Sequence, residues 1–230
     1  MFSFWRKPVF PDFVRAYTEA PRPEPARHWR EVGYSVLDIE TSGLNHKRDA
    51  LLAIGLVEIE EGRIHLNRHW YTLVRPPEGL EVDASSIRIH GITRAELEDA
   101  PLADVVLPEL LARLAGRVMV VHVAQVDVSF LNQAMRTRWG AKLVGPIIDT
   151  ARIAMSLHET AKILGSVQPD MPMPAIQLRA LATRFGLPSY GEHNALNDAL
   201  TTAQLFLAQA TRLEGMGRPT LRGLMKAGGV

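Results

Sequence analysis

In Val36-Leu-Asp38-Ile-Glu40-Thr-Ser-Gly43-Leu44, two carboxylates lie two residues apart within an otherwise apolar strand. Because side chains alternate along a strand, Asp38 and Glu40 point to the same side of the sheet. Two like charges buried together are unfavourable unless a cation neutralises them, and clustered carboxylate oxygens are the ligands that Mg²⁺ or Mn²⁺ prefers. The stretch therefore indicates a metal site, although an isolated D-x-E more often lies on a solvated face or at a strand end.

The segments around this strand predict an α/β fold. Two more strands follow it, joined by a Glu61-Gly62 turn, and short links between consecutive strands imply antiparallel pairing. Farther along, apolar residues three or four apart predict helices that alternate with strands, which suits a mixed sheet flanked by helices. The predicted strands are 34–40, 51–60, 64–74, 117–121 and 143–148. The predicted helices are 102–114, a segment around 130–135, 150–164, 176–185 and 196–212.

The two ends differ from this central region in composition. Residues 1–30 hold five of the fifteen prolines and no regular periodicity, which predicts an N-terminal extension whose Phe10, Phe13 and Trp29 could dock on the body. Glycines and cations from Glu214 onward predict a mobile basic tail. The predicted organisation is an extension at 1–30, one globular domain at 31–213 and a tail at 214–230.

Composition excludes several classes of protein. With 230 residues, 47% of them hydrophobic, the chain can bury one core. A net charge of +1 provides no overall attraction for nucleic acid, so any such binding must be local. The absence of cysteine excludes disulfides and thiolate metal sites. The start MFSFWRKPVFPDF does not match a secretory signal, and no segment has the ~20 apolar residues that span a bilayer, so we expect a cytoplasmic protein without membrane contact.

Three further polar residues follow or precede predicted elements. Asp127 lies beyond the strand at 117–121, at a carboxyl end where α/β active sites gather, although a helix N-cap is an equally good explanation. Asp198 begins the helix at 196–212, and His193 precedes it by five residues. At ~100° per residue the two would lie ~140° apart on a helix, so we expect His193 on the preceding loop, from which it can approach a metal held by Asp198. Each of these residues alone has an ordinary structural explanation. Their occurrence together favours a single metal-binding active site.

These elements, in this order, resemble the DEDDh family of 3′-to-5′ exonucleases, which includes the epsilon subunit of bacterial DNA polymerase III. The similarity runs from about Tyr34 to Leu213. The family motifs D-x-E-T-T-G-L and H-x-A-x-x-D-A correspond to residues 38–44 and 193–199, and I-H-G-I-T to residues 89–93. The resemblance implies an RNase H-like fold with a five-stranded mixed sheet, and it makes 31–213 the exonuclease domain.

The second family motif departs from its usual form. H-N-A-x-F-D is here His122-Val-Ala-Gln-Val-Asp127, so the acid is kept while Val123 replaces the asparagine and Val126 the aromatic residue. Fewer polar groups near the substrate imply an altered affinity or preference. This departure is also the only support for an alternative class, a polymerase-associated nucleic-acid-binding module without turnover.

The family resemblance and the acids together lead to one mechanistic hypothesis. Asp38, Glu40, Asp127 and Asp198 hold two Mg²⁺ or Mn²⁺ ions roughly 3.5–4 Å apart at the scissile phosphate, and Asp38 bridges them. His193 is the general base that takes a proton from the attacking water. By resemblance, the backbone near Glu40 and Thr41 holds the terminal ribose, Leu44 packs against the terminal base, and His90 lines the pocket or has a structural role.

The expected substrates are single-stranded or frayed 3′ ends of DNA, with hydrolysis to nucleoside 5′-monophosphates in repair or proofreading. An RNA-processing exoribonuclease would use the same catalytic residues, so the motifs leave that alternative open. Association with a polymerase or a sliding clamp has no support in the sequence. Gln204-Leu-Phe-Leu207 resembles a clamp-binding peptide, but its apolar residues fit the buried face of a helix better.

Overall fold

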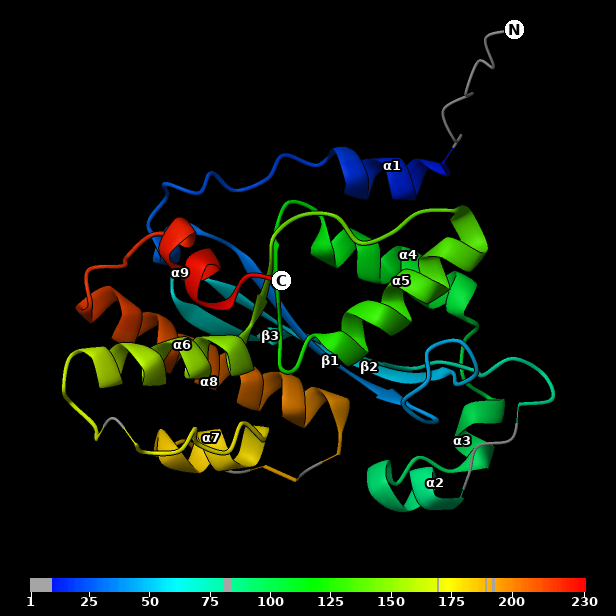
Figure 1. Cartoon of the computed structure of the whole chain (residues 1–230). Helices are drawn as coiled ribbons and strands as arrows, with labels where there is room; N and C mark the ends of the chain where they lie inside the picture. The colour runs from blue at the N-terminus through cyan, green and yellow to red at the C-terminus, as the bar shows by residue number, and fades with distance from the viewer. Residues whose placement is uncertain (1–9, 81–83, 169, 189, 192) are drawn as a thin grey trace, which may run out of the picture.

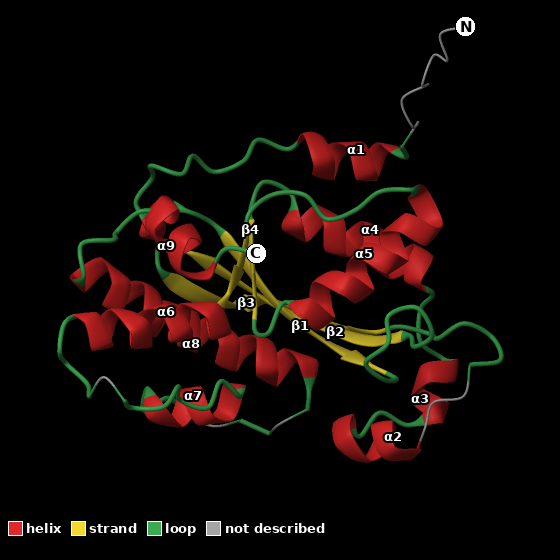
Figure 2. Cartoon of the chain, viewed as in Figure 1, coloured by secondary structure: helices red, strands yellow, loops and turns green. Residues whose placement is uncertain are grey.

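The computed structural model describes residues 10–80, 84–168, 170–188, 190–191 and 193–230; the first part of the predicted extension, residues 1–9, lies outside them. At its centre is a five-stranded sheet with the order β3-β2-β1-β4-β5 (Figures 1 and 2). β1 pairs antiparallel with β2 and parallel with β4, so the sheet is mixed, as predicted. The strands are β1 (Tyr34–Thr41), β2 (Leu51–Glu60), β3 (Arg63–Leu73), β4 (Val118–Val121) and β5 (Ile147–Asp149).

Helices cover both faces of the sheet, and the alternation along β1 divides its side chains between them (Figure 1). Leu37 and Ile39 pack in the cluster that contains α4 and α5, whereas Val36 packs in the cluster that contains α8 and α9. Asp38 and Glu40 continue the alternation of Val36 and therefore face α8. The helices named here are α4 (Ala103–Leu114), α5 (Gln125–Trp139), α8 (Ala195–Gly215) and α9 (Leu221–Gly228).

The predicted turn and the longer helices are confirmed, and several short helices are additional. Glu61 and Gly62 both have positive φ, 51° and 67°, as a two-residue hairpin turn of type I′ requires. The helix after β5 is α6 (Thr150–Ile163) and the next is α7 (Leu178–Arg184). The helices that the periodicity did not predict are α1 (Asp12–Glu19), α2 (Ala84–His90), α3 (Arg94–Glu98), α9 and the 3₁₀ turn Trp29–Glu31.

The N-terminal extension docks on the body through its aromatic residues. The rings of Phe13 and Trp139 meet edge to face with centroids 5.0 Å apart, and the Tyr17 hydroxyl donates to the Val144 carbonyl at 2.8 Å. Trp29 is fully buried, and its indole N–H donates to Glu214. The predicted docking of Phe10, Phe13 and Trp29 is thus confirmed, while the expectation of no regular structure is wrong for α1.

The prediction of a mobile basic tail is wrong. α8 continues to Gly215, and α9 then folds back on α6 with Leu221 and Leu224 buried. The amide of Val230 donates to the Ile147 carbonyl, so the last residues pair with the outer edge of β5. The cations in this segment obscured its apolar face, and burial of that face orders the tail. Among the described residues, no helix has both the length and the apolar character needed to cross a membrane.

Candidate active site

Three of the predicted acids meet where α8 begins above β1. One carboxylate oxygen each from Asp38, Glu40 and Asp198 lies within 4.8 Å of the other two, and all three residues are partly buried. Asp38 and Glu40 come from the same face of β1, and Asp198 comes from the first turn of α8. Oxygen ligands grouped in this way fit a hard divalent cation such as Mg²⁺ or Mn²⁺.

A glycine in β2 allows α8 to approach the strand. Gly55 is paired with Asp38, and a Cβ atom built on it would lie 2.2 Å from the carbonyl carbon of Ala195, the first residue of α8. Any other residue at position 55 would therefore push the start of α8, and Asp198 with it, away from Asp38. We did not predict this role from the sequence, although a glycine within a strand of aliphatic residues is a signal of close backbone approach.

The carboxylates are electrostatically unfavourable without a cation. Burial raises the pKa of Asp38 well above its usual value, and the charges of Asp127, Asp198 and Glu40 raise it further. Burial, followed by the charge of Asp198, raises the pKa of Glu40 to about 7. A bound cation favours the ionised form of each group, so the cluster is suited to exchanging protons for metal.

Asp127 lies beside this group without joining it within 4.8 Å. It is 3% exposed, in the first turn of α5, and α5 packs on the sheet face opposite to α8. Burial raises the pKa of Asp127 to about 8, and the charges of Asp149 and Glu40 contribute. Since Asp127 in turn raises the pKa of Asp38, the four predicted acids share one electrostatic environment.

His193 lies on the loop before α8, as predicted. Its φ is 59°, and its backbone N–H donates to Oδ2 of Asp198 at 3.0 Å. The residue is exposed, and together with Asp38 and Asp198 it lines a pocket of about 770 Å³. The opposite wall of this pocket is formed by α7, through Leu178 and Arg179. A general base above the carboxylates would be accessible to substrate in this position.

The second motif shows an unpredicted role for Asp149. Its carboxylate accepts the backbone N–H groups of Val123, Ala124 and Ala151 at 3.0, 3.1 and 2.8 Å, which fixes the turn between β4 and α5. Val123 has φ 58°, in the left-handed region where β-branched residues are strained and asparagine is much more common. The family's asparagine suits this backbone, so Val123 introduces local strain as well as removing an amide.

The structure places the three predicted substrate-binding residues around the end of β1. Leu44 is 84% exposed, so its side chain is accessible to a base. The Thr41 hydroxyl donates to the Gly43 carbonyl. His90 accepts the amide N–H of Ile92 at Nδ1, and its Nε2 lies 3.1 Å from Oγ of Ser86.

His90 is close enough to the site to interact with it electrostatically. Burial lowers the pKa of His90, and the charge of His193 lowers it further. Ser86, which contacts the His90 ring, also donates to the Thr41 carbonyl at 3.0 Å. Ser86 thus links α2 to the end of β1, and the His90 ring contacts Ser86 from within α2.

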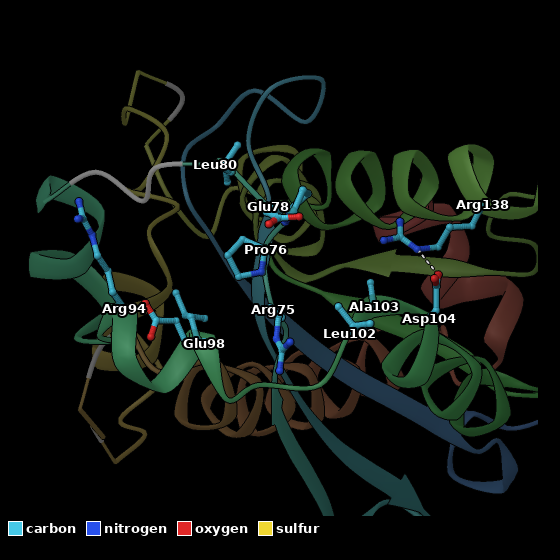
Figure 3. Close-up of a pocket in the computed structure, with 13 residues that line it drawn as sticks. Arg75, Pro76, Glu78, Leu80, Arg94, Glu98, Leu102, Ala103, Asp104 and Arg138 are labelled. Carbon is cyan, nitrogen blue, oxygen red and sulfur yellow. Dashed lines mark hydrogen bonds and ion pairs between the residues drawn. The ribbon is translucent and has the colours of Figure 1, made fainter.

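A second large pocket lies away from these residues (Figure 3). Its volume is about 750 Å³, and none of the predicted site residues lines it. Its lining includes Arg75, Arg94 and Arg138 but also Glu78, Glu98 and Asp104, and Arg138 pairs with Asp104 at 2.6 Å. Because the two signs of charge are balanced, this pocket does not select an anionic polymer.

Comparisons with known proteins connect the fold to nucleases. The family model described as exonuclease, of the RNase T type, matches residues 35–206. The chain is 32% identical over 193 residues to the PolC-type DNA polymerase III of Thermotoga maritima, covering 84% of this chain and 13% of that protein. It is 28% identical to the DNA polymerase III epsilon subunit of Aquifex aeolicus, covering 76% of this chain and 78% of that protein. The chain thus spans only about an eighth of the length of the PolC-type relatives.

Solved structures share the fold at lower identity. Exonuclease X in complex with 5′-overhanging duplex DNA matches 85% of this chain and 99% of its own, with a TM-score of 0.60 and 23% identity. The nuclease domain of 3′hExo, a DEDDh family member bound to rAMP, matches 84% and 97% of the two chains, with a TM-score of 0.63 and 14% identity. The predicted RNase H-like fold is confirmed.

Proposed function

The chain belongs to the exonuclease family whose model spans residues 35–206, and on this premise we propose that it removes nucleotides from the 3′ end of DNA as nucleoside 5′-monophosphates. The observation that carries the proposal is the convergence of Asp38, Glu40 and Asp198 within 4.8 Å beside His193. Asp38 and Glu40 are far from the second pair, His193 and Asp198, in sequence. A protein that only bound nucleic acid would gain nothing from concentrating carboxylates where an anionic strand must lie.

The donor set of the site fits divalent cations. Asp38, Glu40 and Asp198 would provide carboxylate ligands, and Asp127 would complete the set for two Mg²⁺ or Mn²⁺ ions. Asp38 is the natural central ligand, because its pKa is raised by the charges of all three other acids. When bound, the cations would supply positive charge that stabilises the phosphate in the transition state.

His193 would act on the attacking water. In its neutral form a ring nitrogen accepts a proton as the water oxygen bonds to phosphorus. The bond between phosphorus and the 3′ oxygen breaks, and that oxygen takes a proton from solvent, so the products are a 5′-monophosphate and a shortened strand with a 3′ hydroxyl. The hydrogen bond from the His193 amide to Asp198 would fix the position of the base relative to a metal ligand.

The end of β1 would bind the terminal nucleotide. Leu44 offers an exposed apolar side chain against which a base can pack, and the backbone at Thr41 lies next to Glu40 for contact with the ribose. His90 would act indirectly, since its hydrogen bonds through Ser86 position the Thr41 carbonyl.

A preference for DNA is supported by the relatives, which include polymerase III epsilon and PolC-type proteins. The second candidate is an exoribonuclease, favoured by the similarity to 3′hExo bound to rAMP and to a 3′-exonuclease that recognises a histone mRNA stem-loop. Attachment to a clamp through residues 204–207 is disfavoured, because Leu205 and Phe206 are fully buried.

The proposal is tested with matched 3′-labelled single- and double-stranded DNA and RNA oligonucleotides, mixed in competition, with Mn²⁺ or with EDTA. We expect Mn²⁺-dependent release of labelled 5′-mononucleotides, fastest from single-stranded DNA. Faster release from RNA would support the second candidate. Cleavage within the strand, or no Mn²⁺-dependent product from any of the four substrates, would refute a 3′-to-5′ exonuclease.

A further inference from the structure

A small cavity lies between α6, α7 and α8, three helices on the same face of the sheet (Figure 1). Its volume is about 100 Å³, and it shares no lining residue with the pocket that contains Asp38 and His193. Part of its lining is apolar, with Leu181 and Phe185 from α7 and its C-terminal end. The polar part consists of His158, Ser166, Arg184 and Arg212.

His158 is the buried polar group of this cavity. The residue is 3% exposed, and neither Nδ1 nor Nε2 has a hydrogen-bond partner among the residues that the structure describes. Buried polar side chains in folded proteins nearly always have a partner, because an unpaired one is destabilising. Imidazole always carries at least one N–H donor, so a ligand in the cavity can accept a hydrogen bond from His158.

Two arginines make the cavity positive. Arg184, at the end of α7, and Arg212, in the last turns of α8, line it, and no aspartate or glutamate does. Both residues are exposed, and neither guanidinium group forms an ion pair or a hydrogen bond within the described part of the chain, so both are accessible to an anion. Guanidinium groups bind oxyanions through paired N–H donors.

The size of the cavity limits the ligand. A cavity of about 150 Å³ holds one benzene molecule, so the 100 Å³ here has room for a single phosphate group and is too small for a nucleotide. We propose that His158, Arg184 and Arg212 bind one phosphate group, either free inorganic phosphate or a phosphate of a nucleic-acid strand.

Binding at this cavity would affect α7. The helix contributes Arg184 to the cavity and Leu178 and Arg179 to the pocket with His193, so it forms a wall of each. A phosphate held between α7 and Arg212 ties α7 to α8. Amide hydrogen exchange in residues 178–184 therefore slows when the cavity is filled.

The first experiment measures thermal unfolding and amide exchange in EDTA with increasing inorganic phosphate, at an ionic strength kept constant with chloride. EDTA removes metal-bound phosphate as a cause, and chloride controls for screening. The test variants are His158→Leu and the double variant Arg184→Gln/Arg212→Gln; the matched control is Arg136→Gln, an exposed arginine on α5. Phosphate should raise Tm and protect residues 178–184 in the wild type and the control only.

The second experiment identifies whether the bound phosphate is free or belongs to a nucleic-acid strand. Its probe is a 3′-phosphorylated oligonucleotide in EDTA. If the phosphate belongs to a strand, the double variant binds the oligonucleotide more weakly and with a smaller salt dependence, while inorganic phosphate has little effect. If it is free phosphate, the oligonucleotide binds both proteins equally. Identical responses of the wild type and the double variant to both probes would overturn the proposal.

Discussion

The backbone N–H of His193 donates a hydrogen bond to Oδ2 of Asp198 at 3.0 Å. The two residues are five apart in sequence, and the left-handed φ of His193, 59°, turns the chain so that its amide reaches the first turn of α8. The proposed base and a proposed metal ligand thus form one local unit. A change at either residue affects the position of the other.

Replacing His193 by alanine is expected to lower the rate of mononucleotide release by about 10²–10⁴-fold, because the proton acceptor is lost. His193→Asn serves as a companion variant, since asparagine tolerates the left-handed backbone and separates loss of the base from backbone strain. Both variants should be impaired alike. His69→Ala, at an exposed position on β3, is the control and should match the wild type. A pH–rate profile unaltered by His193→Asn would reject the role of general base.

Without metal, the protein is expected to lose stability as the pH rises from about 4.5 to about 8. The pKa of Glu40 is raised in the folded state from 4.5 to about 7, and that of Asp127 from 3.8 to about 8. A carboxyl group whose pKa is raised by folding stabilises the folded protein at pH values below its pKa in the unfolded chain. This contribution disappears as the pH rises through its pKa in the folded protein. The carboxyl groups of Glu60 and Glu96, whose pKa values are lowered, act below this window. Burial lowers the pKa values of His90 and His122, so these two groups oppose the loss below pH 6.5, and the net loss is clearest between about 6.5 and 8.

This pH dependence can be measured as Tm in EDTA and again with Mn²⁺. Asp127→Asn should flatten the profile in EDTA, because the amide cannot ionise. Mn²⁺ should raise Tm more at the upper end of the window than at the lower end, since the metal displaces protons from the carboxylates. A Tm that increases steadily with pH in EDTA would contradict the prediction.

Replacing Val123 by asparagine is expected to raise the free energy of unfolding by about 1 kcal/mol, because a β-branched residue in the left-handed region is strained. Urea denaturation measures the change. Val105→Asn is the control: it makes the same replacement at an exposed position in α4, where asparagine is no better than valine. Equal effects of the two replacements would show that backbone strain at position 123 is not the cause.

Gly55→Ala is expected to destabilise the protein by about 1–3 kcal/mol, because its Cβ would overlap the backbone of Ala195. It should also lower activity on the order of 10²-fold, since displacing α8 moves Asp198 relative to Asp38. Gly215→Ala, at the far end of α8, is the control: apart from its own helix turn and chain neighbours, no described atom lies within 4 Å of the new Cβ, so activity should be unchanged. Wild-type activity in Gly55→Ala would show that this close approach is not needed.

The parts of the fold that local sequence could predict are those with strong periodicity. The predicted segment 51–60 coincides with β2, and the predicted loop position of His193 is confirmed. The family resemblance is confirmed as well. α1 and α9 were missed because each is a short helix stabilised by docking on the body rather than by its local sequence.

Other parts of the site depend on tertiary packing. The offset of Asp127 from the group of three acids follows from its helix lying on the opposite face of the sheet, which spacing along the chain does not show. Asp149 is the last residue of β5, and its contacts with the backbone of Val123 and Ala124 depend on β4 and β5 lying side by side. Gly55 likewise acquires its role only when α8 packs on β2.

The central claim is tested most directly by Mn²⁺-dependent release of 5′-mononucleotides from a 3′-labelled single strand, with wild-type protein, Asp198→Asn and, as a control, the exposed Asp12→Asn. The asparagine at 198 can still accept the His193 hydrogen bond, so Tm in EDTA should stay near that of the wild type. We predict release by the wild type and Asp12→Asn, and none above the EDTA background by Asp198→Asn. Wild-type release by Asp198→Asn would contradict catalysis by the carboxylates that meet above β1.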